Sequence, residues 1–168
     1  MTPTLLQRLT TVYIPTEDRI RISAEDNKGR VVVLWLTQRL LKRLVPALVE
    51  WHEKRMGNSI GADVRQSFAQ ISAVSCLAPQ QPVNSEASID AGAIESIDIK
   101  RGVDGVCLVF KTSGFEPAEV AFGELMLRQW LDIVYRVSVM AEWTSIPWPS
   151  WLQESCCAGQ AEGSRVLN

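Results

Sequence analysis

The sequence predicts a single α+β domain in which a small antiparallel β-sheet or β-sandwich packs against two main helices, with a short helical insertion. Residues 19–36 and 96–110 each have the pattern of a β-hairpin, and each hairpin precedes a long amphipathic helix pattern. The length agrees with this class, since 168 residues suit one domain of ordinary size. We expect the globular domain to span residues 1–152 and a flexible C-terminal tail to span residues 153–168.

Composition and charge argue against several kinds of partner. The chain is 46% apolar and 21% charged, and its net charge of −2 creates no field that would draw the protein onto nucleic acid or an anionic membrane. No apolar run approaches the roughly 20 residues of a transmembrane helix. The N-terminus lacks the basic start and apolar stretch of a signal peptide. We therefore expect a cytoplasmic protein with no membrane partner.

The cysteines and glycines match no cofactor motif. Cys76, Cys107, Cys156 and Cys157 do not have the spacing of a metal site, and the adjacent Cys156 and Cys157 are poorly placed for a structural disulfide. No basic residue lies near that pair in the sequence to lower a thiol pKa. Phosphate-loop and dinucleotide-binding signatures are absent as well. We expect no metal and no cofactor.

The N-terminal third predicts three strands. Residues 5–14 are expected to form an edge strand, and residues 19–23 alternate isoleucine with arginine, as in a strand with one solvated face. Asn27 and Gly29 then indicate a hairpin turn before the β-branched run within residues 30–36.

The first helix is expected to begin at Thr37, a favourable N-cap residue. Pro46 projects to the centre of the solvent side, where the carbonyl group that it leaves unpaired can be hydrated. We therefore predict one continuous, gently bent helix with Pro46 exposed. The apolar face of this helix consists of Leu40, Leu41, Leu44, Val45, Leu48 and Trp51.

The middle of the chain predicts a helix and a loop. A short amphipathic helix is expected at residues 62–74, with Val64, Phe68 and Ile71 facing inward. Residues 77–94 contain no aromatic and no basic residue but several small polar residues and two prolines. That composition predicts an exposed, mobile loop.

The second half repeats the pattern of the first. A hairpin at residues 96–110 turns at Asp104-Gly105, a short strand follows at 118–122, and Gly123 precedes a helix at 124–143. The recurrence indicates a weak internal repeat. The apolar stripe of the helix consists of Met126, Leu127, Trp130, Ile133, Val134, Val137 and Ala141.

His52 is the single histidine, so any mechanism that needs an imidazole base depends on it. It projects to the edge of the apolar helix face, and the sequence contains no nucleophile-elbow motif. We therefore expect a structural histidine and a non-enzymatic protein. The alternative is a small-ligand-binding or enzymatic domain with a cleft that involves His52 and a carboxylate partner.

The solvent side of the first helix carries a modest basic face. Arg39, Lys42, Arg43 and Lys54 supply the positive charges, and two glutamates on the same side reduce them. A net charge of about +2 without interleaved aromatic residues is weak for tracking phosphates. Nucleic-acid binding through the Arg39–Lys54 face, with Arg39, Lys42 and Arg43 as anion contacts, is a further alternative.

The segment 143–151 holds three tryptophans and two prolines. We expect an ordered element that clamps the chain end onto the core, and it is also a candidate docking surface, since tryptophan is favoured at binding hot spots. Off the main stripe of the last helix lie further apolar side chains. The candidate interaction residues are Leu125, Val139, Trp143, Trp148 and Trp151.

The expected order is a strand, a hairpin, two helices, a hairpin, a short strand and a closing helix. Over residues 5–143, this order resembles the head domains of the coiled-coil scaffold superfamily that contains double-strand-break-repair and centriole-cartwheel scaffold proteins. The resemblance implies a β-sandwich with a helical insertion and a bridging or self-associating role. The helix at 124–143 departs from that family because it is short and lacks sustained heptads. We therefore expect an interaction or assembly module whose partner is a second copy or another protein.

Overall fold

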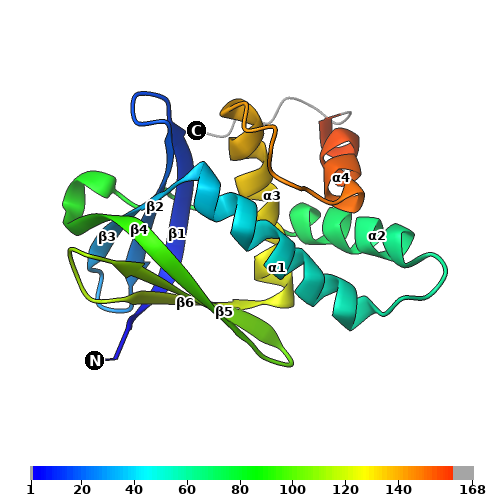
Figure 1. The fold of residues 1–168 in the computed structure, drawn as a ribbon, viewed down its shortest axis with the longest axis horizontal. Coiled ribbons are helices and arrows are strands. Elements are labelled where there is room, and N and C mark those ends of the chain that lie inside the picture. Colours follow the sequence, from blue (N-terminus) through cyan, green and yellow to red (C-terminus); the bar gives the residue numbers. More distant parts are fainter. Residues whose placement is uncertain (1, 161–168) are drawn as a thin grey trace.

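The computed structural model describes residues 2–160, with side chains described as far as Ser155. The described chain contains six strands, four α-helices and a short 3₁₀ turn at Ser85–Ala87 (Figure 1). In chain order, the strands and helices are β1 Thr4–Ile14, β2 Arg19–Asp26, β3 Val31–Leu36, α1 Gln38–Met56, α2 Ala62–Ser75, β4 Ser88–Arg101, β5 Gly105–Thr112, β6 Ala118–Gly123, α3 Glu124–Met140 and α4 Ser150–Gln160.

The six strands form a closed barrel in sequence order. Strands β1–β3 make one antiparallel meander and β4–β6 make a second. Two parallel pairings join them: β3 pairs with β4, and β1 pairs with β6. The α+β class is therefore correct, but the open sheet or sandwich that we expected is wrong. Residues 5–14 are not an edge strand either, because β1 has a partner on each side.

The expected loop at 77–94 is also wrong over its second half. Residues 77–84 are irregular, but residues 88–94 form the first half of β4, and residues 88–93 of it lie along β3 in the parallel pairing. Small residues such as Ala91, Gly92 and Ala93 carry little β-propensity, so the local sequence gives no strand signal there. The parallel partner supplies the stability that this half-strand lacks by itself.

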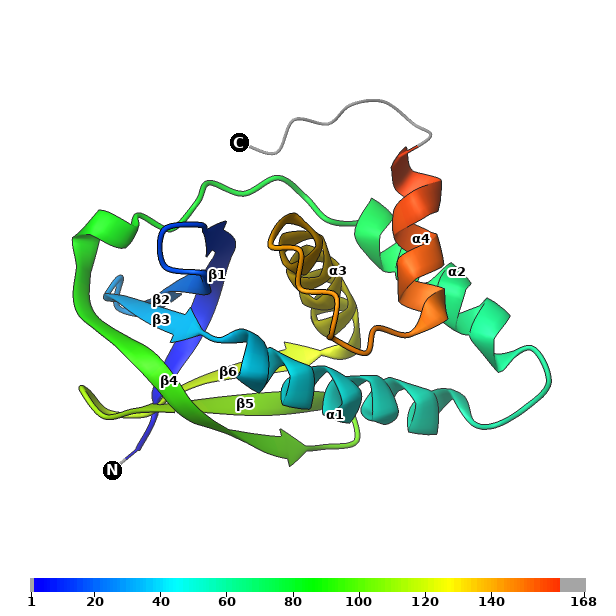
Figure 2. The ribbon, with the colours of Figure 1, turned by 45° about the horizontal axis from the view of Figure 1, so that its top comes forward.

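Each meander is followed by a helix that lies against the barrel, so the order βββα occurs twice (Figure 2). Helices α1 and α3 pack on the barrel, whereas α2 and α4 lie farther out and contact each other (Figure 2). The recurring pattern in the sequence thus corresponds to two similar structural units.

The predictions that the first helix is continuous across Pro46 and that Pro46 is exposed are confirmed. Helix α1 runs without interruption through Pro46, which is exposed, while Leu44 and Leu48 are 3% and 0% exposed. The hydroxyl of Thr37 caps the helix by accepting a hydrogen bond from the amide of Leu40 at 3.4 Å. A proline on the solvent-exposed face of a helix does not disturb the packing of the buried face.

The C-terminal segment differs from the prediction in three respects. Helix α3 ends at Met140, three residues before the expected end, and Met126 is 47% exposed rather than inward. Residues 150–160 form α4, and Ser155 is buried, so the flexible tail does not begin at residue 153. Residues 161–168 lie outside the described residues.

Candidate functional site

A cluster of polar side chains is buried where the four helices meet. Arg128 of α3 and His52 of α1 are 2% and 1% exposed, and Gln66 and Gln70 of α2 are 1% and 0% exposed. The guanidinium of Arg128 donates to the side-chain oxygen of Gln66 at 2.6 Å, and it lies 5.5 Å from the ring centre of Trp151 on α4. The cluster therefore connects all four helices.

These contacts fix the rotation of α2. The side-chain amide of Gln66 donates to the carbonyl of His52 at 3.0 Å, and that of Gln70 donates to the carbonyl of Arg128 at 2.9 Å. From α3, the amide of Gln129 donates to the carbonyl of Ala73 at 2.9 Å. Because each bond is directional, α2 cannot roll about its axis without leaving buried polar groups unpaired.

The imidazole of His52 is neutral and has no hydrogen-bond partner among the described residues of this cluster. Burial, followed by the charges of Arg128 and Arg55, lowers the pKa of His52 to about 3. Neither ring nitrogen of His52 has a hydrogen-bond partner among the described residues, so no carboxylate orients the ring. Burial also lowers the pKa of Arg128, while Glu124, 3.5 Å away, opposes that shift. The alternative from the sequence, a cleft in which His52 pairs with a carboxylate, is not formed among the described residues.

The buried neutral His52 predicts a loss of stability in mild acid. Its pKa is about 3 in the folded chain and about 6.5 in an unfolded chain, so between these values only the unfolded state binds the proton. The free energy of unfolding should fall by up to about 2 kcal/mol between pH 7 and pH 5. Urea unfolding at both pH values measures this.

His52→Phe is the control, because it keeps an aromatic ring between Trp51 and Trp151, whose ring centres lie 5.0 and 6.3 Å away. The variant should lose little stability over the same pH range. Burial alone would raise the pKa of Asp26, but hydrogen bonds from Arg30 and Lys28 together lower it. Because Asp26 is present in both proteins, its effect on the pH dependence of stability is the same in each. Equal pH dependence in the two proteins would contradict the prediction.

The outward face of α2 is apolar, which is the reverse of the expected orientation. Val64, Phe68 and Ile71, predicted to face inward, are 58%, 69% and 42% exposed. The preceding Ile60 is fully exposed. We name these four residues the α2 apolar face. Glutamines at 66 and 70, spaced one turn apart on the opposite side, are the sequence signal that could have revealed this orientation.

The tryptophan segment packs against its own chain, as the clamping interpretation predicts. The indole N–H of Trp143 donates to the carboxylate of Asp18 at 3.2 Å, and that of Trp148 donates to the hydroxyl of Ser138 at 3.1 Å. Trp143 and Trp151 are 6% and 1% exposed. These two rings have little surface left for a partner, so a docking surface on Trp143 and Trp151 is not supported.

The remaining sequence candidates are scattered. Leu125 and Val139 of α3 are 51% and 56% exposed. Arg39, Lys42 and Arg43 are exposed and make no ion pair with the described residues, so they remain free to meet an anion. Cys156 and Cys157 lie in the backbone of α4, but their side chains are outside the described residues.

Lys54, the last residue of the basic face, is engaged within the protein. Glu50 pairs with it at 2.7 Å and with Arg101 of β4 at 3.1 Å. The ammonium of Lys54, as the largest cause, and then Arg101 lower the pKa of Glu50, which therefore stays ionised and offsets positive charge on this face. The charge available to a phosphate backbone is confined to the first half of α1.

No helix in the described part of the chain is both long and apolar enough to cross a membrane. Within the same residues, no three His, Cys, Asp or Glu side chains gather closely enough to hold a metal ion. Comparisons with protein-family models, curated proteins and solved structures gave no match.

Proposed function

We propose that this protein is a non-enzymatic assembly module that self-associates through the α2 apolar face. The observation that carries the proposal is the orientation of α2, which buries two glutamines and presents Val64, Phe68 and Ile71 to the outside. An amphipathic helix on a free monomer ordinarily does the opposite. Contiguous exposed apolar side chains are a mark of interaction surfaces.

The exposed orientation is built into the fold. Gln66 and Gln70 are held by hydrogen bonds of 2.6–3.0 Å to α1 and α3, and α4 packs on α2 as well. A helix fixed by directional bonds keeps its outer face in place before a partner arrives. Preorganisation of this kind lowers the entropy that association costs.

The face suits a second copy of the chain. Within α2, Phe68 lies between Val64, four residues before it, and Ile71, three residues after it, so these three residues of the face have nearly the same pattern in both directions. In an antiparallel pair of α2 helices, Phe68 would meet its own symmetry mate and Val64 would meet Ile71 of the other copy. The three residues are uncharged, so a two-fold axis brings no like charges together. Ser67 and Ser72 flank the face and permit close approach.

The expected dimer is modest in affinity. Helix α2 has 14 residues and is about 21 Å long at 1.5 Å per residue. Contacts through one such helix fall short of the roughly 800 Å² per partner that a standard interface buries. We therefore expect a concentration-dependent monomer–dimer equilibrium, not a permanent dimer.

Phe68→Glu is expected to make the protein monomeric at concentrations where the wild type dimerises, because two carboxylates would meet at the symmetry axis. Sedimentation equilibrium up to several hundred micromolar protein measures this. Since Phe68 is 69% exposed, the free energy of unfolding of the variant at monomeric concentration should stay within about 1 kcal/mol of wild type.

Leu125→Glu is the matched control, because Leu125 is a similarly exposed apolar residue on α3. This variant should still dimerise. A monomeric wild type at all concentrations would overturn the proposal. If Leu125→Glu abolishes dimerisation and Phe68→Glu does not, the self-association surface lies on α3, where Leu125 and Val139 are sequence candidates.

A pair of double variants tests the register. Val64→Lys with Ile71→Glu should retain a dimer that weakens with salt, since each lysine would face a glutamate of the other copy. Val64→Lys with Ile71→Lys should be monomeric. If the two double variants had the same monomer–dimer equilibrium, the antiparallel pairing would be wrong. If no self-association is detected and the same face binds a different protein, the partner is another protein and not a second copy of this chain.

The bridging role implied by the resemblance to scaffold head domains is compatible with this proposal, although the barrel is closed and α3 ends at Met140 without a stalk. The dimer proposed here depends on α2, an element inserted between the two meanders, and not on the closing helix. Nucleic-acid binding through Arg39, Lys42 and Arg43 receives less support, because the three cations have no stacking partner on the same face.

A further inference from the structure

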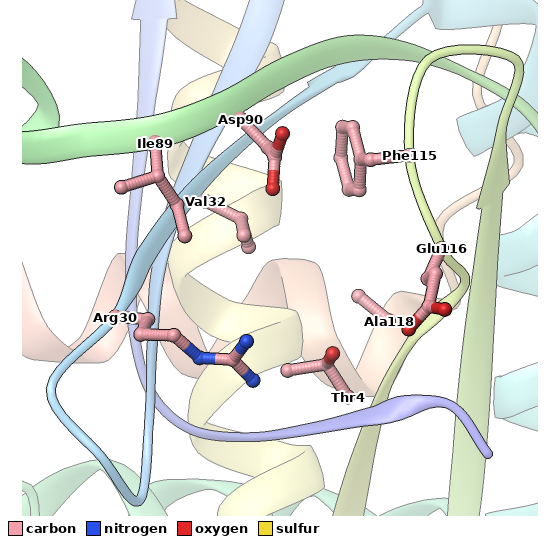
Figure 3. Close-up of a pocket in the computed structure, with 8 residues that line it drawn as sticks. All are labelled: Thr4, Arg30, Val32, Ile89, Asp90, Phe115, Glu116 and Ala118. Carbon is pink, nitrogen blue, oxygen red and sulfur yellow. The ribbon is translucent and has the colours of Figure 1, made fainter.

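A second candidate site lies at the barrel, apart from the helices. A pocket of about 280 Å³ is lined by parts of both meanders. Its apolar wall consists of Val32, Ile89 and Ala118, and Arg30, Asp90, Glu116, Phe115 and Thr4 complete it (Figure 3). Mouths of β-barrels are common positions for small-molecule sites. The volume is close to the lower limit for ligand pockets and suits a molecule of amino-acid size.

The positive charge of the pocket is held in place. Arg30 donates through its Nε to the carboxylate of Asp26 at 2.7 Å, and the carboxylate also accepts the backbone amides of Lys28 and Arg30 at 2.8 and 2.9 Å. Asp26 is 5% exposed, so this anchor is buried. The terminal nitrogens of Arg30 have no partner among the described residues and extend into the pocket (Figure 3). A fixed guanidinium is suited to a carboxylate.

The opposite side of the pocket is suited to a cation. The carboxylate of Asp90 points into the same space as Arg30, with the ring of Phe115 beside it (Figure 3). Gly92 lets that ring lie close, since a Cβ there would come within 3.0 Å of the Phe115 ring. A carboxylate next to an aromatic ring is a favourable setting for an ammonium group.

Three charges therefore line the pocket without cancelling one another. Asp90 and Glu116 have no ion pair with Arg30 or with any other described residue, and Arg30, although paired with Asp26 through its Nε, keeps its terminal nitrogens available to a ligand. One cation and two carboxylates complement a molecule that carries one carboxylate and two cationic groups. Electrostatic complementarity of this kind selects among ligands of equal size.

We propose that this pocket binds a basic amino acid, with Arg30 holding its carboxylate and with Asp90 and Glu116 each accepting one of its two cationic groups. The apolar wall of Val32, Ile89 and Ala118 faces the methylene groups between them. Lysine has the required charges and a size that fits 280 Å³. This site is independent of the α2 apolar face, so the result for one leaves the other unaffected.

Titration of the isotope-labelled protein with lysine, followed by backbone amide NMR, tests the proposal. Lysine should shift the amides of the pocket segments, with Gly92 and Gly114 as reporters beside Phe115, and should bind about tenfold or more tightly than norleucine, which lacks the second ammonium group. Acetate and methylammonium, which each carry one of the charges, should bind more weakly still.

Asp90→Asn and Glu116→Gln are the decisive variants, because neither side chain has a partner within the described chain and neither change disturbs the Arg30–Asp26 anchor. One of the two should remove the preference for lysine over norleucine, and the other should weaken both ligands by about tenfold. Glu95→Gln, an exposed carboxylate on β4 outside the pocket, should bind lysine like wild type.

Three results would overturn the proposal: no shift of the pocket amides at tens of millimolar lysine, equal affinities for lysine and norleucine in the wild type, or equal losses from Glu95→Gln and Asp90→Asn. Thermal melts of each variant identify any effect that comes from unfolding. The association state at the NMR concentration should be the same with and without lysine, which separates this test from that of the α2 apolar face.

Discussion

Replacing Trp151 with alanine is expected to lower the free energy of unfolding by about 3–5 kcal/mol, the usual cost of deleting a fully buried large side chain. Trp151 is 1% exposed and lies between His52 of α1 and Arg128 of α3, with Leu152 at 0% exposure beside it in sequence. The deletion removes the contact that fastens α4 to the other helices. For a chain of this size the melting temperature should fall on the order of 10 °C.

Two further variants separate packing from other causes. Trp151→Phe should cost much less than Trp151→Ala, because the Trp151 indole N–H has no acceptor among the described residues and a phenyl ring retains most of the contact. Trp148→Ala should also cost less, since Trp148 is only partly buried. Equilibrium unfolding in guanidinium chloride measures all three. Equal midpoints for wild type and Trp151→Ala would show that α4 does not dock as described.

Local patterns in the sequence were sufficient for most of the elements. The turn signals at Asn27–Gly29 and at Asp104, just before Gly105 opens β5, mark the turns between paired strands, and Thr37 caps α1. These features depend on residues a few positions apart, so the chain reveals them directly. The closure of the barrel is different in kind. Closure depends on the parallel pairing of β3 with β4 and on that of β1 with β6, and the strands of each pair are distant in sequence.

The orientation of α2 was mispredicted because hydrophobic periodicity shows which residues share a face but not which face is buried. Val64, Phe68 and Ile71 do share a face, as predicted, and that face points outward. The competing effect is the burial of Arg128, whose guanidinium and backbone carbonyl require partners from α2. In the sequence, the glutamines at 66 and 70, one turn apart on the opposite side of α2, were the relevant signal.

The pocket at the barrel could not be predicted from the sequence for a similar reason. Arg30, Asp90 and Glu116 come from three separate segments, and Asp90 lies in the part of β4 that was expected to be a loop. Only the parallel pairing of β3 with β4 brings Asp90 beside the strand that follows Arg30. The sequence candidate His52 lies elsewhere and is buried among aromatic rings.

Gly105→Ala is expected to lower the free energy of unfolding by about 3 kcal/mol or more. A Cβ at this position would lie 2.3 Å from the carbonyl oxygen of Phe122, which belongs to the backbone of β6 and cannot rotate away. Gly105 faces Gly123 in the first pair of the β5–β6 ladder, so relief of the clash requires the two strands to separate at the end of β6, where α3 begins. Overpacking usually costs about 1–3 kcal/mol and occasionally more, and a clash of a Cβ with a backbone carbonyl that cannot move aside lies at or above the upper end of that range.

The turn at Asp104–Gly105 therefore requires glycine for a reason beyond turn geometry. Gly105 does not have the positive φ that Gly29, Gly57 and Gly61 have, so an alanine there is excluded by the neighbouring strand and not by its own dihedral angles. Gly114→Ala is the matched control, since a Cβ there meets nothing within 4 Å and its φ is not positive. That variant should be neutral or gain up to about 1 kcal/mol through a less flexible unfolded chain. Urea unfolding of both variants decides the matter: equal midpoints for Gly105→Ala and Gly114→Ala would mean that β5 and β6 do not approach as closely as the barrel requires.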